Sequence, residues 1–140
     1  METIACFFSG STGTERVVDV CTHRLLSCHG SYMGTARQWL KAAHSHPLAK
    51  EREIMLDSGA FSAWSKGEET TVDQVIASYD ALVEAYLPFY KEIWLINLDK
   101  IPGERGRSAT PAEIDEALRV SDKNFEILTK RYGNRVLPVF

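Results

Sequence analysis

Four short apolar runs recur along the chain without alternation between polar and apolar residues, and they limit the fold more than any other feature. They span residues 25–28, 54–56, 93–98 and 136–140. Such runs are typical of parallel strands whose two faces are both covered, because a strand with one solvated face alternates. Helical patterns separate the runs, which gives the order strand, helix, strand, helix, strand, helix, strand. The sequence therefore predicts an α/β fold with a parallel sheet.

The three predicted helices open with the same chemistry. Residues 35–38, 71–74 and 110–113 each begin with Thr and carry Gln or Glu three positions later. In such a capping box the Thr side chain accepts a backbone hydrogen bond, and the Gln or Glu side chain reaches back to the cap. Apolar residues then follow at helical spacing. They are Trp39, Leu40 and Ala43; Val72, Val75, Ile76, Tyr79, Leu82, Val83 and Tyr86; and Ile114, Leu118, Phe125, Leu128 and Tyr132.

The length of 140 residues suits one domain. We divide it into an N-terminal region at 1–23, with a further strand at 4–8 before a turn at 9–13, and β/α units at 24–140. A doubly wound sheet fits this length, whereas a complete barrel needs at least ~200 residues. Because the last apolar run reaches Phe140, we expect the N-terminal portion of a (β/α) barrel of the TIM type.

The composition restricts the functional classes. No apolar run approaches the ~20 residues of a membrane span, and Met1 to Thr3 lack the basic region of a signal peptide. We therefore expect a cytoplasmic protein that does not use a membrane. The net charge is −3, and nucleic-acid binding relies on clustered Lys and Arg, so this segment is not expected to grip nucleic acid alone.

The three cysteines, Cys6, Cys21 and Cys28, do not suggest a disulfide framework, because their number is odd. Cys21 and Cys28 each lie close to a histidine, which raises the alternative of a zinc site. Tetrahedral zinc sites usually use closely spaced pairs of cysteines, and no Cys-x2-Cys pair occurs. The sequence favours ordinary buried thiols.

Chemically active side chains follow the predicted strands directly. In parallel α/β folds, active sites collect at the carboxyl ends of the strands. Two carboxylates from neighbouring strand ends are a recurring enzymatic arrangement, whereas a lone histidine carries little specificity. The residues concerned are Ser27, Cys28 and His29 after the first strand, Asp57 and Ser58 after the second, and Asn97 and Asp99 after the third.

The segment from Asp57 to Phe61 is the main candidate. Gly59 permits a positive φ or a close backbone approach. An aromatic ring beside a carboxylate can stack on a planar base while the carboxylate binds the polar edge of that base. An Asx-type turn with Phe61 folded into the core explains the same residues, so both interpretations stay open. Asp99 could also cap a loop, but no helix start follows it directly, which favours function.

Asp57-Ser58-Gly59-Ala60-Phe61 resembles the Asp-Ser-Gly-Gly-Phe/Tyr-Gln motif of queuine tRNA-ribosyltransferases, also called tRNA-guanine transglycosylases. With Ala60 and Ser62 it looks more like the bacterial and phage relatives that place 7-deazaguanines in DNA. The resemblance covers about residues 24–140. Its supporting features are Asn97-Leu98-Asp99 at a strand end, Thr110-Pro111 at a helix start, and the strand from Arg135 to Phe140.

The resemblance implies a TIM barrel that exchanges a guanine in nucleic acid for a 7-deazaguanine, with DNA favoured over tRNA. An Asp attacks the sugar C1′, guanine leaves, and the new base attacks the covalent intermediate, as two carboxylates share the work in retaining glycosidases. By matching position, Asp57 is the acid/base carboxylate. Ser58 and Gly59 bind the base, Phe61 stacks on it, and Asp99 accepts from its N–H groups.

Two parts of the family site are missing. The covalent Asp and the zinc site of three Cys and one His lie on later strands, beyond Phe140, so no cofactor or metal is expected in this segment. The implied partners are a 7-deazaguanine base, DNA or tRNA, and a complementing C-terminal half or a second copy of the chain. The alternatives are a catalytically inert base-binding or assembly module, and an unrelated barrel hydrolase that uses Asp57 and Asp99.

Overall fold

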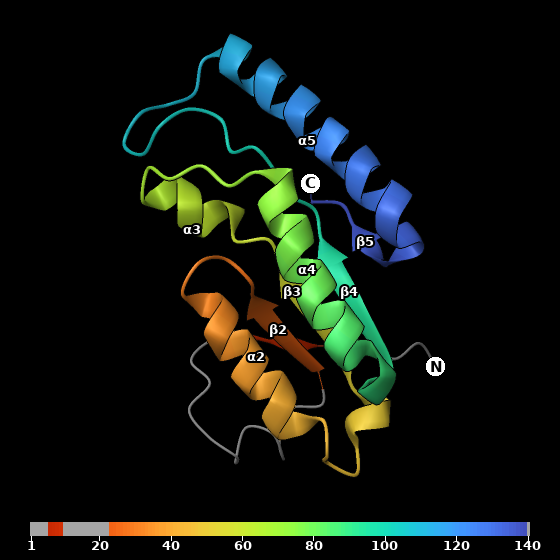
Figure 1. Ribbon diagram of the computed structural model, residues 1–140. Coiled ribbons are helices and arrows are strands. Elements are labelled where there is room, and N and C mark those ends of the chain that lie inside the picture. Colours follow the sequence, from red (N-terminus) through yellow and green to blue (C-terminus); the bar gives the residue numbers. More distant parts are fainter. Residues whose placement is uncertain (1–5, 10–22, 140) are drawn as a thin grey trace.

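The computed structural model describes residues 6–9 and 23–139 (Figure 1). Most of the expected turn at 9–13, the start of the expected strand at 4–8, Cys21 and Phe140 lie outside the described residues. The strands are β1 (Phe7–Phe8), β2 (His23–Ser27), β3 (Glu53–Asp57), β4 (Glu92–Ile96) and β5 (Val136–Leu137). The α-helices are α2 (Tyr32–Ala43), α3 (Ala60–Ser65), α4 (Val72–Tyr86) and α5 (Pro111–Tyr132), and the 3₁₀ helices are η1 (Ala49–Glu51), η2 (Leu87–Phe89) and η3 (Gly133–Arg135).

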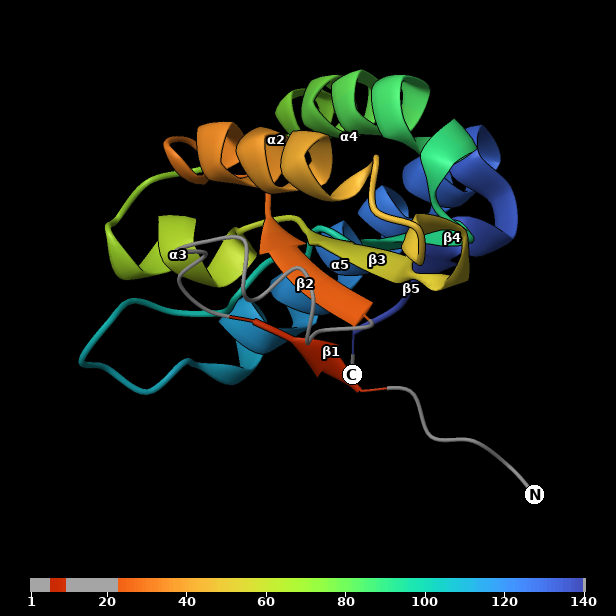
Figure 2. The ribbon, with the colours of Figure 1, turned by 90° about the horizontal axis from the view of Figure 1, so that it is seen from below.

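The strands form one parallel sheet in the order β1-β2-β3-β4-β5, which confirms the predicted α/β class. Each strand therefore pairs with the next one along the chain. A doubly wound sheet reverses its strand order at a switch point, and the described strands contain no reversal. Successive right-handed crossovers between neighbouring strands place their helices on one side of a sheet. Figure 2 shows α2 and α4 side by side over the same face.

The two faces of the sheet differ in burial, which corrects the prediction that both are covered. Along β2, β3 and β4, buried and half-buried residues alternate strictly. Leu26, Leu56 and Leu95 point to the helix-covered side and are at most 3% exposed. Met55 and Trp94, which lie on the opposite face, are half-buried. A continuous apolar run hides this asymmetry, because apolar residues occupy both faces.

Two of the three predicted capping boxes are confirmed. Thr71 and Thr110 each accept from the backbone N–H three residues on, and Gln74 and Glu113 return the hydrogen bond. The box at Thr35 is wrong, because α2 already begins at Tyr32. The backbone turns directly after β2, where the amide of Tyr32 donates to the His29 carbonyl. Thr35 consequently lies inside the helix and has no cap to form.

No pattern in the sequence predicted α3, whose six residues follow the candidate turn at Asp57. The helix is too short to show a periodic apolar pattern, and it starts from Gly59, which has no side chain with which to cap it.

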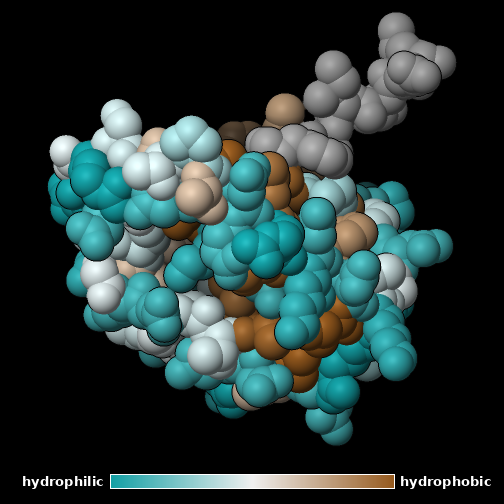
Figure 3. Space-filling view, turned by 90° about the horizontal axis from the view of Figure 1, so that it is seen from above, coloured by the Kyte–Doolittle hydropathy of each residue, from teal (hydrophilic) through white to brown (hydrophobic). Residues whose placement is uncertain are grey.

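The predicted apolar face of α5 is wrong in the first half of the helix, where the residues expected to be buried are exposed. Ile114 and Leu118 are exposed, whereas Ala117 and Leu128 are buried. The view from above shows apolar patches exposed among polar side chains (Figure 3). The second half of the helix is tied to α4, where the Tyr132 hydroxyl donates to Asp80 at 2.7 Å. Within residues 6–9 and 23–139, no helix is long and apolar enough to cross a membrane.

Tyr79 on α4 joins the carboxyl ends of the two central strands. Its side chain is fully buried. The hydroxyl lies 3.1 Å from the carbonyl oxygen of Leu56 on β3 and 2.7 Å from that of Ile96 on β4, and it shares its proton between them. This contact fixes the spacing of the strand ends from which Asp57 and Asp99 emerge.

Tyr79→Phe should lower the free energy of unfolding by about 1–2 kcal/mol, because two buried carbonyl groups lose a donor while the ring is kept. Urea denaturation followed by circular dichroism measures the change. Tyr32→Phe is the matched control, since Tyr32 is exposed on α2, and its stability should stay within about 0.5 kcal/mol of the wild type. Equal effects of the two substitutions would contradict the role given to the Tyr79 hydroxyl.

Candidate functional site

Asp57 ends β3 on the half-buried face of the sheet, opposite Ser27 of β2. Its carboxylate Oδ2 accepts a hydrogen bond from the backbone N–H of Gly59 at 3.2 Å, which forms the Asx-type turn that the sequence left open. Burial raises the pKa of Asp57, and the Gly59 hydrogen bond and the nearby His29 oppose that rise only in part. A carboxyl group that holds its proton more firmly than usual is suited to proton transfer.

Gly59 is required by two constraints at once. Its φ is +78°, in the left-handed region that glycine favours. A Cβ at this position would lie 2.0 Å from the Cβ of His29. Both expectations for Gly59, a positive φ and a close approach, are therefore confirmed. The close approach locks the turn after β3 against the turn after β2.

Ser58 points away from Asp57 and into the helix-covered side. It is 3% exposed, and its hydroxyl donates to the carbonyl oxygen of Asn97 at 3.1 Å. The donor of this side chain thus joins the end of β3 to the segment after β4. A hydrogen bond from Ser58 to a base stays a prediction, and within the described contacts its proton is already engaged.

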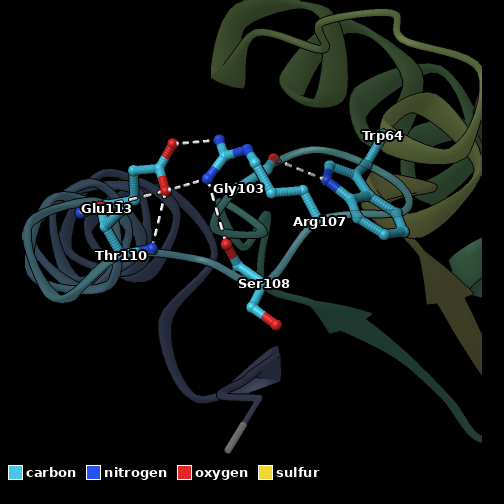
Figure 4. Close-up of polar contacts among 6 residues, drawn as sticks. All are labelled: Trp64, Gly103, Arg107, Ser108, Thr110 and Glu113. Atoms are coloured by element: carbon cyan, nitrogen blue, oxygen red, sulfur yellow. Dashed lines mark hydrogen bonds and ion pairs between the residues drawn. The ribbon is translucent and has the colours of Figure 1, made fainter.

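Phe61 lies on α3 and is 68% exposed, so the alternative that folds it into the core is wrong. Its ring centroid lies 5.7 Å from that of Trp64. Trp64 is half-buried, and its indole N–H donates to the carbonyl oxygen of Gly103 at 3.0 Å (Figure 4). The indole therefore fastens α3 to the loop after Asp99, while the Phe61 ring stays free to meet a partner.

Asp99 follows β4 and is half-buried. Its Oδ1 accepts from the side-chain amide of Asn97 at 2.9 Å, and that amide also donates to the carbonyl oxygen of Ser121 on α5. Burial raises the pKa of Asp99; the Asn97 hydrogen bond lowers it, and the charge of Asp57 raises it further. The two carboxyl groups are thus close enough to influence each other, as their positions on neighbouring strand ends predict.

The loop between Asp99 and α5 is fixed at its far end. Arg107 binds both carboxylate oxygens of Glu113, at 2.9 Å and 2.5 Å, and also donates to the carbonyl oxygen of Ser108 (Figure 4). Arg107 is the main cause that lowers the pKa of Glu113 to about 2, and the hydrogen bonds from Thr110 add to the effect. The capping box and the ion pair therefore share one carboxylate.

Candidate residues line two of the pockets on the described part of the chain. Asp99 lines one of about 170 Å³ together with Ala60, Trp64 and Lys100. Ser58 lines another of about 530 Å³ together with Cys28 and His29. Their common wall is the segment 68–70 between α3 and α4. Asp57 and Phe61 line neither pocket, so the candidate residues surround this region without sharing one cavity.

Sequence reasoning gave His29 little weight, yet the structure engages both of its ring nitrogens. Nε2 lies 3.2 Å from Oε2 of Glu68, and Nδ1 lies 3.1 Å from Oγ1 of Thr70. These partners are about 40 residues further along the chain, so no local spacing could reveal them. The position of His29 directly after a strand was the available signal.

No group of three His, Cys, Asp or Glu side chains suited to a metal occurs in the part of the chain that the structure describes. The zinc site that the resemblance implies is expected beyond Phe140 and stays a prediction. Cys28 is buried, as expected of an ordinary thiol; burial, with a smaller effect of Asp57, raises the pKa of this thiol to about 12. Cys6 is exposed, contrary to that expectation.

Comparisons with protein-family models, with curated proteins and with solved structures gave no match for this chain. The functional inference therefore rests on the residues and their geometry.

Gly59→Ala should destabilise the protein by at least about 2 kcal/mol more than Gly67→Ala, because only the first creates a steric overlap. Gly67 is the matched control, since its φ of +70° is similar and nothing lies within 4 Å of an added Cβ. The control alone should cost about 1–2 kcal/mol for the left-handed backbone. Denaturant unfolding measures both, and equal losses would contradict the contact with His29.

Asp57→Asn should lower the pKa of Asp99, because the charge of Asp57 is one cause of its rise. In the wild type both side chains should titrate above ~3.9, the ordinary value for Asp. Carbon-13 NMR of the carboxyl groups across a pH series measures the titrations. Asp115→Asn, on the exposed surface of α5, should leave Asp99 unchanged. An Asp99 titration that is indifferent to Asp57→Asn would show that the carboxyl groups act independently.

Proposed function

We propose that this chain carries the base-recognition and proton-transfer part of a transglycosylase that exchanges guanine for a 7-deazaguanine in nucleic acid. The observation that carries the proposal is the pair of carboxyl groups, Asp57 and Asp99, on neighbouring parallel strand ends, with the pKa of Asp57 raised by burial. An acid/base group and an acceptor for the N–H edge of a base then emerge from neighbouring strand ends.

The sheet supports a barrel of the TIM type as the setting for this site. Its strands follow each other in chain order, and α2 and α4 cover one face. In barrels of this kind the chemistry sits at the carboxyl ends of the strands. Asp57 and Asp99 both emerge there. The half-buried opposite face, with Met55 and Trp94, corresponds in the proposal to the interior of the barrel.

Asp57 acts as the acid/base group in the proposed reaction. It gives its proton to the departing guanine and takes one from the incoming 7-deazaguanine, so that it returns to its starting state. Its burial supports this role, because a raised pKa leaves a larger protonated fraction near neutral pH. The bond to the sugar C1′ is formed by the family's covalent Asp, which the resemblance places on a later strand.

In the proposal, two residues bind the base: Asp99, which lines the smaller pocket, and Phe61, which is exposed on α3 outside that pocket. A carboxylate accepts two N–H groups from the edge of a guanine-like ring. The hydrogen bond from Asn97 orients Asp99 through Oδ1 at 2.9 Å. The exposed Phe61 ring, which is kept near Trp64 at 5.7 Å between centroids, offers a flat apolar surface on which the base stacks.

Isothermal titration calorimetry with a 7-deazaguanine base tests the pocket. Asp99→Asn should weaken the affinity about tenfold or more, since a hydrogen bond to a charged group contributes about 1.5–3 kcal/mol. Phe61→Ala should weaken it through the loss of stacking, about 1–3 kcal/mol. Asp115→Asn is the control and should leave the affinity unchanged. A wild-type chain that does not bind the base, or Asp99→Asn binding as tightly as the wild type, would refute the proposed pocket.

Incorporation of a labelled 7-deazaguanine tests the reaction and its polymer. Parallel assays on double-stranded DNA and on tRNA separate the two substrates, and we expect the label in DNA. Base binding without exchange in either polymer, with a segment supplying the covalent Asp present, would favour the inert base-binding module.

A further inference from the structure

His29 bridges two segments that the chain keeps far apart. It follows β2, and both of its contacts lie between α3 and α4: Glu68 at 3.2 Å from Nε2 and Thr70 at 3.1 Å from Nδ1. The His29 side chain is 15% exposed, whereas that of Glu68 is 55% exposed. A contact with so exposed a carboxylate contributes little by itself. The second contact, from the same ring to a half-buried hydroxyl, gives the imidazole one defined orientation.

The Cβ of His29 is also held in place, in addition to its ring. Its Cβ lies against Gly59, where an added methyl group would come within 2.0 Å. The amide of the preceding residue, Cys28, donates to the carbonyl oxygen of Asp57 at 3.0 Å. A shift of His29 would therefore disturb the turn that contains Asp57 and Gly59.

The segment that His29 holds forms the wall of the Asp99 pocket. Glu68 to Thr71 all line that pocket, and residues 68–70 also line the larger one beside His29. At the other side of the wall, Lys100 reaches Glu69 at 3.4 Å between two exposed groups. The amide of Glu68 donates to the carbonyl oxygen of Ala63 on α3 at 2.9 Å. The wall is thus fastened to α3 and to the strand ends on both sides.

We propose that His29 is a positioning residue for the base pocket: its imidazole holds the wall 68–71 against the strand ends that carry Asp57 and Asp99. The identity of the ligand rests on the proposed function, whereas the positioning itself does not. His29 touches neither the base nor the sugar in this role. It sets the width of the pocket in which Asp99 meets the ring.

Hydrogen–deuterium exchange in the absence of ligand tests the positioning directly. His29→Ala should raise the exchange rates of the amides at 68–71 about tenfold, because local opening becomes easier. The amides of Ile54 and Leu56, in the core of β3, should exchange as before. His29→Gln keeps one hydrogen bond and should show a smaller rise. Unchanged exchange at 68–71 in His29→Ala would overturn the proposal.

Substitutions at Glu68 and Thr70, the two residues that His29 contacts, keep the test valid if His29→Ala folds poorly. Glu68→Gln and Thr70→Val should each raise the exchange at 68–71, and Glu68→Gln combined with His29→Gln should add less than the two single effects together. Glu126→Gln, exposed on α5, is the control and should change nothing. Fully additive effects of His29→Gln and Glu68→Gln would show that the two side chains do not act together.

Calorimetry with a 7-deazaguanine base then links the positioning to the pocket. His29→Ala should weaken the affinity about tenfold, since small displacements of binding groups have large effects, and His29→Gln should restore part of it. If the wild type fails to bind the base, the proposed function fails while the exchange result still decides on His29. If the base binds equally well to His29→Ala, the positioning role is refuted.

Discussion

The close approach of His29 and Gly59 is the contact on which the rest of the site depends. It leaves no room for a Cβ at Gly59, and it packs the turn after β2 against the turn after β3. The left-handed backbone of Gly59 then directs the chain into α3, which brings Phe61 to the surface and Trp64 to the loop after β4. The same contact fixes the Cβ of His29, whose imidazole ring reaches Glu68 and Thr70.

The raised pKa values of the two carboxyl groups follow from the asymmetry of the sheet. Helices bury one face completely, whereas the other keeps half-buried residues. Asp57 lies on that second face, where water is partly excluded and the cost of ionisation is higher. Asp99 follows the neighbouring strand, and both its burial and the charge of Asp57 raise its pKa. The chemistry at this edge is thus a consequence of strand register and of the layer that α2 and α4 form.

Local signals in the sequence were sufficient for the strands, for two helix starts and for the neighbouring carboxyl groups. Thr71 and Thr110 begin helices because their capping partners are three residues away. Three other features were not predictable, and only the contacts of His29 span long separations. Thr35 lost its cap because the chain turns earlier, at His29, and Ile114 faces outward although its spacing fits a core stripe. The contacts of His29 with Glu68 and Thr70 could not be predicted, because a single histidine in the sequence does not indicate its partners.

The charges around the pocket limit how a nucleic acid could meet it. Glu68, Glu69 and Asp99 line the smaller pocket, and among the described residues Lys100 is its one cationic side chain. Carboxylates repel phosphates and attract N–H groups, so this surface favours the edge of a base over the backbone that carries it. A base inside a duplex presents its edge to its pairing partner, and it must leave the stack to reach such a pocket. Under the proposed function, recognition of the base and contact with phosphates are therefore separated in space, and groups other than those around Asp99 hold the backbone.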